Sequence, residues 1–442
     1  MILNMAATYL EVADMVIKKV FTVLIVAMLT LSVVGCAQPV SSDVLYSDKP
    51  RDTSPEVSQG NIERLSEGNS EFAFDLYRAL AAEDGNLFYS PYSISVALAM
   101  TYAGARGETE TQMADTMRFL LPQQDLHPAF NGLDIEFSKR GEGAEGKDGE
   151  GFRLNVVNAI WGQKDYKFLP EFLDVLAVNY GAGLRLLDFI NQPEESRVTI
   201  NNWVSDQTEE RIKDLIPQGT IDSLTRLVLT NAIYFNAAWK YQFNENATTD
   251  GIFTLLDGSD IKVSMMGQTE SFGYTTGDRY QAIELPYDGE ELSMVIVLPG
   301  AGQLKEFEDS LSAELMEDIL SGLEQGRGKI ALTMPKFEFE SSFSLVDTLA
   351  GMGMPIAFTS GADFSGMTGN NDLYIGDILH KAFVSVDESG TEAAAATAVV
   401  MELTAMPQPP LELALDRPFI FLIRDLETES VLFVGRVENP AL

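Results

Sequence analysis

Cysteine, histidine and basic residues are scarce in this chain of 442 residues. Its one cysteine, Cys36, rules out a disulfide within the chain. Its two histidines, His127 and His380, are too few to build a zinc site of the usual Cys/His type. Lys and Arg number 30 against 66 Asp and Glu, and the resulting net charge of -36 disfavours nucleic acid as a partner, because phosphates require clustered cations.

Signatures of catalysis are also missing. Nucleophilic catalysis requires a nucleophile, a base and oxyanion donors, and no G-x-S-x-G motif occurs. Residues 141–147 match the spacing of a phosphate-binding loop, but Asp148 stands where Ser or Thr must bind magnesium, so we expect a flexible surface loop. We predict that His127, in a proline-flanked polar stretch, is exposed and that His380 is a hydrogen-bonded structural residue. The sequence therefore predicts neither an enzyme nor a cofactor or metal site.

Residues 1–35 have the pattern of an export signal. Lys18 and Lys19 precede an apolar run of 15 residues, Val20 to Val34, which is shorter than the roughly 20 residues that span a bilayer. The small residues that end in Cys36 resemble a bacterial lipobox, which implies cleavage before Cys36, lipidation of its thiol and a position outside the cell, anchored to the envelope membrane. An ordinary signal peptide or a membrane anchor with a chance cysteine is the alternative. Translation from Met15 is an alternative to translation from Met1.

The rest of the chain is predicted to be a tether followed by one domain. Residues 36–66 are rich in Ser, Pro, Asp and Glu, so we predict a flexible tether. Residues 67–442 alternate helical and strand patterns without an internal repeat, which indicates a single mixed α+β domain. Helices are expected near 72–84, after the capping pair at 90–91, and near 171–180, 200–215 and 306–323. Strands are expected at 154–161, 227–238, 282–285, 292–298, 329–338, 380–387, 419–423 and 431–437.

The pattern of one stretch, Glu388 to Met406, does not favour any single secondary structure. Its sequence is E-S-G-T-E-A-A-A-A-T-A-V-V-M-E-L-T-A-M, and Ser389 with Glu392 has the spacing of a helix-capping box before an alanine run. The preceding residues 380–387 alternate like a strand, and three prolines occur within 407–410, where neither a helix nor a central strand can continue. Helix, loop and strand all remain open for this stretch.

Five separated motifs, in order, resemble those of the serpin family, and the resemblance extends over residues 67–442. They are N-L-F-Y-S-P-Y-S-I-S at 86–95, L-T-N-A-I-Y-F-N-A-A-W at 229–239, M-P-K-F at 334–337, L-H-K-A-F-V-S-V-D-E-S-G-T-E-A-A-A-A-T at 379–397 and R-P-F-I-F-L-I at 417–423. The resemblance implies a serpin fold of three β-sheets and eight or nine helices, with an exposed reactive loop after Glu388. It also implies a monomer that traps a serine or cysteine protease in a 1:1 covalent complex as the cleaved loop inserts into the main sheet.

The resemblance also assigns roles to individual residues. A polar cluster beneath the main sheet, which controls its opening, is implied at Ser90, Ser93, Asn231 and His380. Trp239, Lys336 and Glu388 match the place where the loop first enters the sheet, with an expected Lys336–Glu388 ion pair. The loop hinge comprises Glu388, Gly390, Thr391, Glu392, Ala393, Ala394, Ala395, Ala396 and Thr397. Family spacing places the reactive bond at Thr404–Ala405. Because of the three prolines at 407–410, the bond could also lie elsewhere in the range from Leu403 to Met406.

The composition of the hinge favours insertion over a permanently exposed loop. A strand that enters the middle of a sheet buries alternate side chains. Counted from Thr391, the inward set is Thr391, Ala393, Ala395, Thr397 and Val399, all small or β-branched and uncharged. An inhibitor is therefore favoured over the alternative, a non-inhibitory serpin that acts as a binding or chaperone-like module.

Overall fold

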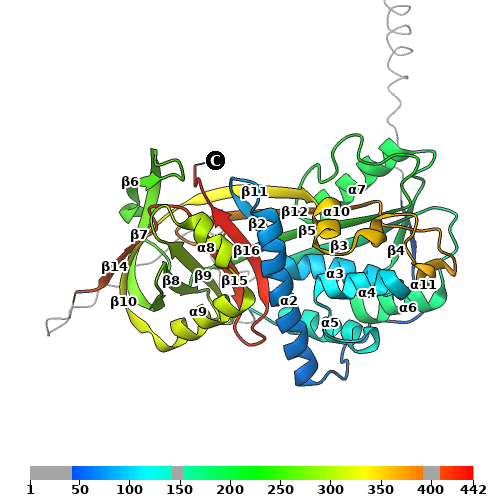
Figure 1. Cartoon of the computed structure of the whole chain (residues 1–442), viewed down its shortest axis with the longest axis horizontal. Coiled ribbons are helices and arrows are strands. Elements are labelled where there is room, and N and C mark those ends of the chain that lie inside the picture. Colours follow the sequence, from blue (N-terminus) through cyan, green and yellow to red (C-terminus); the bar gives the residue numbers. More distant parts are fainter. Residues whose placement is uncertain (1–41, 142–152, 392–408, 442) are drawn as a thin grey trace, which may run out of the picture. The chain divides into compact units, whose positions relative to one another are not determined.

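The computed structural model describes residues 42–141, 153–391 and 409–441 (Figure 1). The helices are α2 (Gln59–Leu80), α3 (Pro91–Tyr102), α4 (Gly107–Met117), α5 (Gln123–Phe137), α6 (Pro170–Tyr180), α7 (Pro193–Gln207), α8 (Leu304–Ser310), α9 (Ala313–Gln325), α10 (Val346–Met352) and α11 (Ser365–Thr368), with short 3-10 helices at Glu245–Ala247 and Pro355–Phe358. The described part of the chain thus has ten α-helices where the resemblance implied eight or nine, and three of them have seven residues or fewer.

The strands form two hydrogen-bonded sheets in the described ranges. The first has the order β1 (Asp43–Leu45), β4 (Leu184–Leu187), β3 (Arg153–Gln163), β5 (Leu227–Ala238), β13 (Gly390–Thr391), β12 (Asp377–Val386) and β11 (Phe337–Ser344). The second has the order β14 (Leu411–Ala414), β10 (Arg327–Pro335), β7 (Asp260–Thr276), β8 (Tyr280–Pro286), β9 (Leu292–Pro299), β15 (Phe419–Asp425), β16 (Val431–Val437) and β2 (Leu87–Tyr89), and β6 (Thr249–Thr254) pairs with β7. The 17-residue β7 pairs with β6 and β10 along its first part and with β8 at its end, so it joins two groups of strands into one network.

The seven-stranded sheet is covered on both faces, which explains the continuous apolar sequence of β5. Leu229, Ile233 and Phe235 belong to the main core, on the face that α3 covers, whereas Val228 and Ala232 belong to a second core under α7. Figure 1 shows α7 on one side of β3, β5 and β12, and α3 to α6 on the other. A strand that is covered on both faces buries the side chains of both, so its polar and apolar residues do not alternate.

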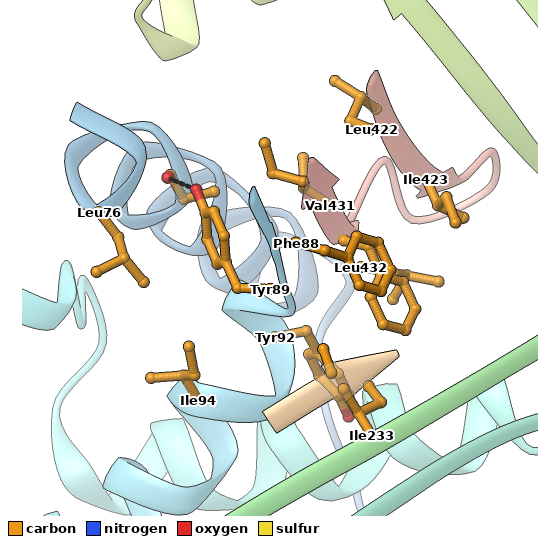
Figure 2. Close-up of a cluster of buried hydrophobic side chains, with 14 of the residues drawn as sticks. Leu76, Phe88, Tyr89, Tyr92, Ile94, Ile233, Leu422, Ile423, Val431 and Leu432 are labelled. Atoms are coloured by element: carbon orange, nitrogen blue, oxygen red, sulfur yellow. Dashed lines mark hydrogen bonds between the residues drawn. The ribbon is translucent and has the colours of Figure 1, made fainter. Parts of the chain in front are cut away.

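The main core lies where α2 and α3 meet strands of both sheets. Figure 2 shows side chains of α2 (Leu76), β2 (Phe88, Tyr89) and α3 (Tyr92, Ile94) gathered beside β5 and beside the β15–β16 pair. The Phe88 ring stacks on Phe433 with a centroid separation of 5.0 Å, and the Tyr89 hydroxyl donates to the Ala73 carbonyl oxygen over 2.6 Å. This core connects the seven-stranded sheet to the second sheet.

Two sequence-based expectations are wrong in this part of the chain. The expected flexible tether contains ordered structure, since β1 pairs with β4 and α2 begins at Gln59, with Ser58 as its N-cap accepting from the Asn61 amide. The polar composition was misleading because these residues make hydrogen bonds and ion pairs instead of burying an apolar face. His127 is buried rather than exposed, with its Nδ1 2.7 Å from the Tyr180 hydroxyl.

Element boundaries also differ from expectation in three places. The helix expected over 200–215 is α7, which starts at Pro193 and ends at Gln207, and the apolar residues after it reach the second core without helical structure. The helix expected over 306–323 is divided into α8 and α9, with Ser312 capping the second. The strand expected over 329–338 is divided into β10 and β11 at Lys336.

Candidate functional site

The central feature of the seven-stranded sheet is the junction between β5 and β12, which we call the seam. The two strands run parallel and pair directly over seven positions, from Asp377 opposite Val228 to Phe383 opposite Tyr234. Beyond these positions they no longer pair with each other, and β13 lies between them. Gly390 and Thr391 pair antiparallel with Ala238 and Ala237 of β5, and Thr391 also pairs with Val386 of β12. The first residues of the predicted hinge therefore already occupy the end of the seam.

A tight turn, residues 387–390, reverses the chain from β12 into β13. The Asp387 amide donates to the Gly390 carbonyl oxygen over 2.9 Å, and Asp387 Oδ1 accepts from the amides of Ser389 (2.8 Å) and Gly390 (3.3 Å). A Cβ at Gly390 would lie 2.1 Å from the Ala237 carbonyl oxygen, so only glycine permits this close approach to β5. The turn thus directs the chain that follows into the seam.

The outer face of the turn is held by residues from the segment after β5. The Trp239 and Phe243 amides donate to the carbonyl oxygens of Ser389 and Glu388, each over 2.8 Å. Trp239 Nε1 donates to the Asp387 carbonyl oxygen over 3.0 Å. The turn is therefore anchored to the β5 side of the seam through its main chain.

Glu388 forms the expected ion pair with Lys336. Glu388 Oε2 lies 2.6 Å from Lys336 Nζ, and Glu388 Oε1 accepts from the Thr248 hydroxyl over 2.6 Å. Burial alone would raise the pKa of Glu388, but the hydrogen bonds from Lys336 and Thr248 outweigh it and hold the pKa below its usual value. The Glu388 side chain is 7% exposed and that of Lys336 is 39% exposed, so the carboxylate of this ion pair is buried whereas its cation reaches the surface.

We expect Lys336→Met to lower the free energy of unfolding of the intact protein by about 1–3 kcal/mol, because it leaves the buried Glu388 carboxylate without its cation. The matched control is Lys262→Met, which breaks an ion pair of similar length, 2.5 Å to Asp250, with both side chains more than 60% exposed. That control should cost about 0–1 kcal/mol. The two losses are compared through the denaturant midpoints of the variants. Equal losses would contradict the prediction that the buried Glu388 carboxylate depends on its cation.

Thr391, the first residue of the predicted inward set, has a buried side chain. It is 1% exposed, and its hydroxyl lies 2.9 Å from that of Tyr287. Tyr287 stacks on Trp239 with ring centroids 4.7 Å apart, and burial raises its pKa above the usual value. The pocket that receives Thr391 is therefore walled by aromatic rings and has no room for a long or charged side chain.

The four residues of the predicted polar cluster meet beneath the seam. His380 Nδ1 contacts Asn231 Oδ1, and His380 Nε2 accepts from the Ser90 amide over 3.3 Å. Asn231 Nδ2 donates to the Ser93 hydroxyl over 2.5 Å. Since Asn231 Oδ1 can only accept, His380 carries its proton on Nδ1 and is neutral. Burial lowers the pKa of His380 to about 3, which agrees with that assignment.

The cluster has a fifth member, Asn158, that sequence reasoning did not find. It lies on β3 directly opposite Asn231 in the register, and its side chain contacts Asn231 Nδ2 and donates to the Ser93 carbonyl oxygen over 3.1 Å. An Asn within an apolar strand was the available signal. Thr248 and Tyr287, which contact Glu388 and Thr391, were missed as well, since only the tertiary structure brings them to the loop.

Acidification should destabilise the protein between about pH 6.5 and 5.5. The pKa of His380 is lowered to about 3 by burial, and that of His127 to about 4 by burial and by Arg106. Because the unfolded chain takes up these protons first, near pH 6.5, stability that is present at higher pH is lost as the pH falls, by about 1 kcal/mol for each histidine between pH 6.5 and 5.5. Denaturant midpoints measured across this range test the slope, and His127→Gln should roughly halve it. A flat profile would contradict the buried neutral state of both rings.

Several predicted residues lie outside the described ranges. They are the lipidation residue Cys36, the hinge residues Glu392, Ala393, Ala394, Ala395, Ala396 and Thr397, and the reactive-bond residues Thr404 and Ala405. Within the described ranges, no group of three or more His, Cys, Asp or Glu side chains is placed to hold a metal ion. The site thus consists of a seam, a turn and a polar cluster.

Three comparisons with known proteins, by family model, by sequence and by structure, give matches over most of the chain. The sequence model of the family "Serpin (serine protease inhibitor)" matches residues 67–440. A curated but uncharacterized serpin-like protein of Thermococcus kodakarensis is 40% identical over 435 residues, covering 95% of this chain and 99% of that protein. The leukocyte elastase inhibitor of Homo sapiens is 40% identical over 389 residues, covering 86% of this chain and all of that protein. The crystal structure of human thyroxine-binding globulin superposes with a TM-score of 0.75 at 30% identity, covering 86% of this chain and 99% of that structure.

The family match spans most of the chain, and it includes both strands of the seam, the turn and all five residues of the polar cluster. The mixed α+β fold and the structural match agree with it. This chain therefore belongs to the serpin family.

Proposed function

We propose that this protein inhibits a serine protease by trapping it as a covalent acyl-enzyme while the cleaved loop inserts into the seam. The observation that supports the proposal is the position of β13. Its two residues already lie between β5 and β12, antiparallel to both, with the Thr391 side chain buried. Further insertion continues in the same direction and requires the seven parallel pairs below it to separate.

The hydrogen-bond pattern makes such insertion favourable. A strand that fills the seam replaces one parallel interface with two antiparallel ones, so the number of strand–strand hydrogen bonds rises and their geometry improves. The uncut chain is constrained because the loop must also reach β14, which pairs parallel with β10 in the second sheet. Cleavage between the hinge and β14 removes that constraint, and the acyl-linked protease travels with the end of the inserting strand.

The test is incubation with an elastase-like and with a subtilisin-like protease, followed by a denaturing gel. A band at the summed mass of inhibitor and protease that survives SDS supports the proposal. Clean cleavage into two fragments with both proteases, without such a band, would overturn it. Inactivating the protease by replacing its catalytic serine gives the control, because no acyl bond can then form and no stable band is expected.

A non-inhibitory function is the second candidate. Human thyroxine-binding globulin, which shares the fold at 30% identity, was solved in complex with its ligand, so this architecture also supports a binding protein. In this chain the residue types of the hinge favour the inhibitor, because the inward set from Thr391 to Val399 contains no charge and no proline. Cleavage without insertion would favour the binding function instead.

We also propose that the protein is exported and anchored to the membrane through lipid on Cys36. Support comes from the sequence pattern before Cys36, the only cysteine of the chain. Separately, no helix in residues 42–141, 153–391 or 409–441 is long and apolar enough to cross a membrane. Cys36→Ser should move the protein from the membrane fraction to the soluble fraction or block signal processing, because the thioether forms on that thiol. Fractionation and processing like the wild type would contradict the lipid anchor.

A further inference from the structure

We infer that residues 42–57, which we call the strap, restrain the β4 side of the seven-stranded sheet and slow insertion of the uncut loop. The inference rests on the proposed function, because it concerns the same seam. The strap precedes the residues that the family model matches, 67–440, and it lies where a flexible tether was expected. It is nevertheless bound to the folded domain at three successive places.

The strap first binds the edge of the sheet. Residues 43–45 form β1, which pairs antiparallel with Leu184–Leu186 of β4. The strap then binds α6, whose C-terminal end leads into β4 through three residues. The Ser47 hydroxyl donates to Asp174 Oδ1 over 2.5 Å, and Lys49 Nζ lies 2.7 Å from Asp174 Oδ2. These contacts attach the strap to elements that move together with β4.

The strap next binds α5. Arg51 Nε donates to Asn131 Oδ1 over 2.8 Å, and its Nη2 lies 2.6 Å from Asp134 Oδ2. Asn131 is completely buried and donates in return to the Asp52 carbonyl oxygen over 2.7 Å, while the Asp52 amide donates to the Val178 carbonyl oxygen at the end of α6. Arg51 and Asp52 therefore lie at a junction between α6 and α5.

Helix α5 belongs to the part of the molecule that is fixed to the second sheet. Arg140, just after α5, forms a buried ion pair with Asp425 of β15, with Nε 2.6 Å from Oδ2. The strap then continues into α2, where Asn69 Nδ2 donates to the Val431 carbonyl oxygen of β16 over 2.9 Å. The strap thus connects β4 and α6 to a frame made of α5, α2 and the second sheet.

Insertion requires the two sides of the seam to separate by about 4.8 Å, the spacing of one strand. The β12 side is held to the same frame, because the Ser90 and Phe88 amides donate to His380 of β12 and Ser341 of β11. In this proposal the displacement falls on β5, β3 and β4 relative to α5, and it also breaks the contacts of Ser93 with Asn231 and Asn158. Hydrogen bonds weaken steeply beyond about 3.2 Å, so such a shift must break the contacts of Arg51 and Asp52 with α5 or detach β1 from β4.

The test measures how fast uncut protein converts to the loop-inserted form without any protease. Purified protein is warmed, and the fraction of uncut monomer that remains compact in concentrated urea is followed on gels. Arg51→Ala should convert about a hundredfold faster than the wild type, because it removes hydrogen bonds to a buried amide and to a carboxylate, each worth about a factor of ten. Arg279→Ala, which affects only a 4.0 Å surface contact with Glu306, should convert at the wild-type rate.

Conversion of Arg51→Ala at the wild-type rate would overturn the inference. Loss of native protein into aggregates, with no urea-resistant monomer, would overturn it as well, since that is the result of a merely structural role. Should Arg51→Ala not fold, Asp134→Ala is the second variant, because it removes the carboxylate that Arg51 Nη2 contacts, and conversion about tenfold faster than the wild type is expected. Formation of the SDS-stable complex with a protease is measured in a separate experiment. Loss of that complex would contradict the proposed inhibition, whereas an unchanged rate of conversion would contradict only the role of the strap.

Discussion

Cutting the reactive loop should raise the melting temperature of this protein by about 20 °C. An inserted strand of about 15 residues adds on the order of ten net hydrogen bonds, after the lost parallel pairs are subtracted, each contributing about 1 kcal/mol. In a domain of this size, 1 kcal/mol shifts the melting temperature by about 2 °C. Circular dichroism melts before and after limited proteolysis measure the change, and the cleaved fragments must stay associated. Equal melting temperatures for intact and cleaved protein would contradict insertion into the seam.

The same experiment on Thr391→Arg separates insertion from cleavage. Thr391 is 1% exposed in the uncut protein, and its hydroxyl lies 2.9 Å from that of Tyr287. The uncut chain can avoid burying an arginine there by withdrawing β13 from the seam, whereas full insertion must bury the charge without a partner. We expect the loop to be cut normally, the gain in melting temperature to be lost, and the SDS-stable complex to be replaced by cleaved protein. Thr391→Ser, which keeps the hydroxyl, is the control and should behave like the wild type. A full gain in the arginine variant would exclude this path of insertion.

Changing the residue before the reactive bond should change the target protease. Family spacing from Gly390 places the bond at Thr404–Ala405, outside the described residues. An inserting strand of about 15 residues at roughly 3.3 Å each agrees with that position. Pro407 makes Met406–Pro407 a poor substrate bond, since proline has no amide hydrogen. No basic residue lies between Leu403 and Met406, so a trypsin-like protease, whose primary pocket holds a carboxylate, should not be inhibited by the wild type.

Thr404→Arg should therefore gain inhibition of trypsin by several orders of magnitude while inhibition of an elastase-like protease falls. Inhibition kinetics with both proteases measure the exchange, and Thr397→Arg, which places the same charge earlier in the loop, should not gain trypsin inhibition. Mass spectrometry of the released C-terminal peptide of the wild type should show that it begins at Ala405. A peptide that begins at Pro409 or later would place the extra loop residues before the bond, and the assignment would move.

The parts of the fold that the sequence predicted well are those whose pattern follows from local burial. Strand β5 has the bounds expected from its apolar run, and Ser90 caps α3 through the Ser93 amide as the Ser-Pro pair indicated. The resemblance also named the right members of the polar cluster and the Lys336–Glu388 pair. These features are readable because each depends on a residue type at a fixed spacing.

The remaining features depend on contacts between segments far apart in the chain. A polar segment such as 42–57 has no apolar periodicity, and it is ordered by β4 and by side chains such as Asn131, Asp134 and Asp174, some 80 to 127 positions away. His127 has polar neighbours in sequence, yet packing against Tyr180 buries it. By itself the sequence determined that the inward-facing residues of the hinge, counted from Thr391, are small or β-branched and uncharged, as entry into a sheet requires. Only the tertiary structure decided where it enters, because β5 and β12, about 150 residues apart, stop pairing at one end of the seam and leave space there for Gly390 and Thr391.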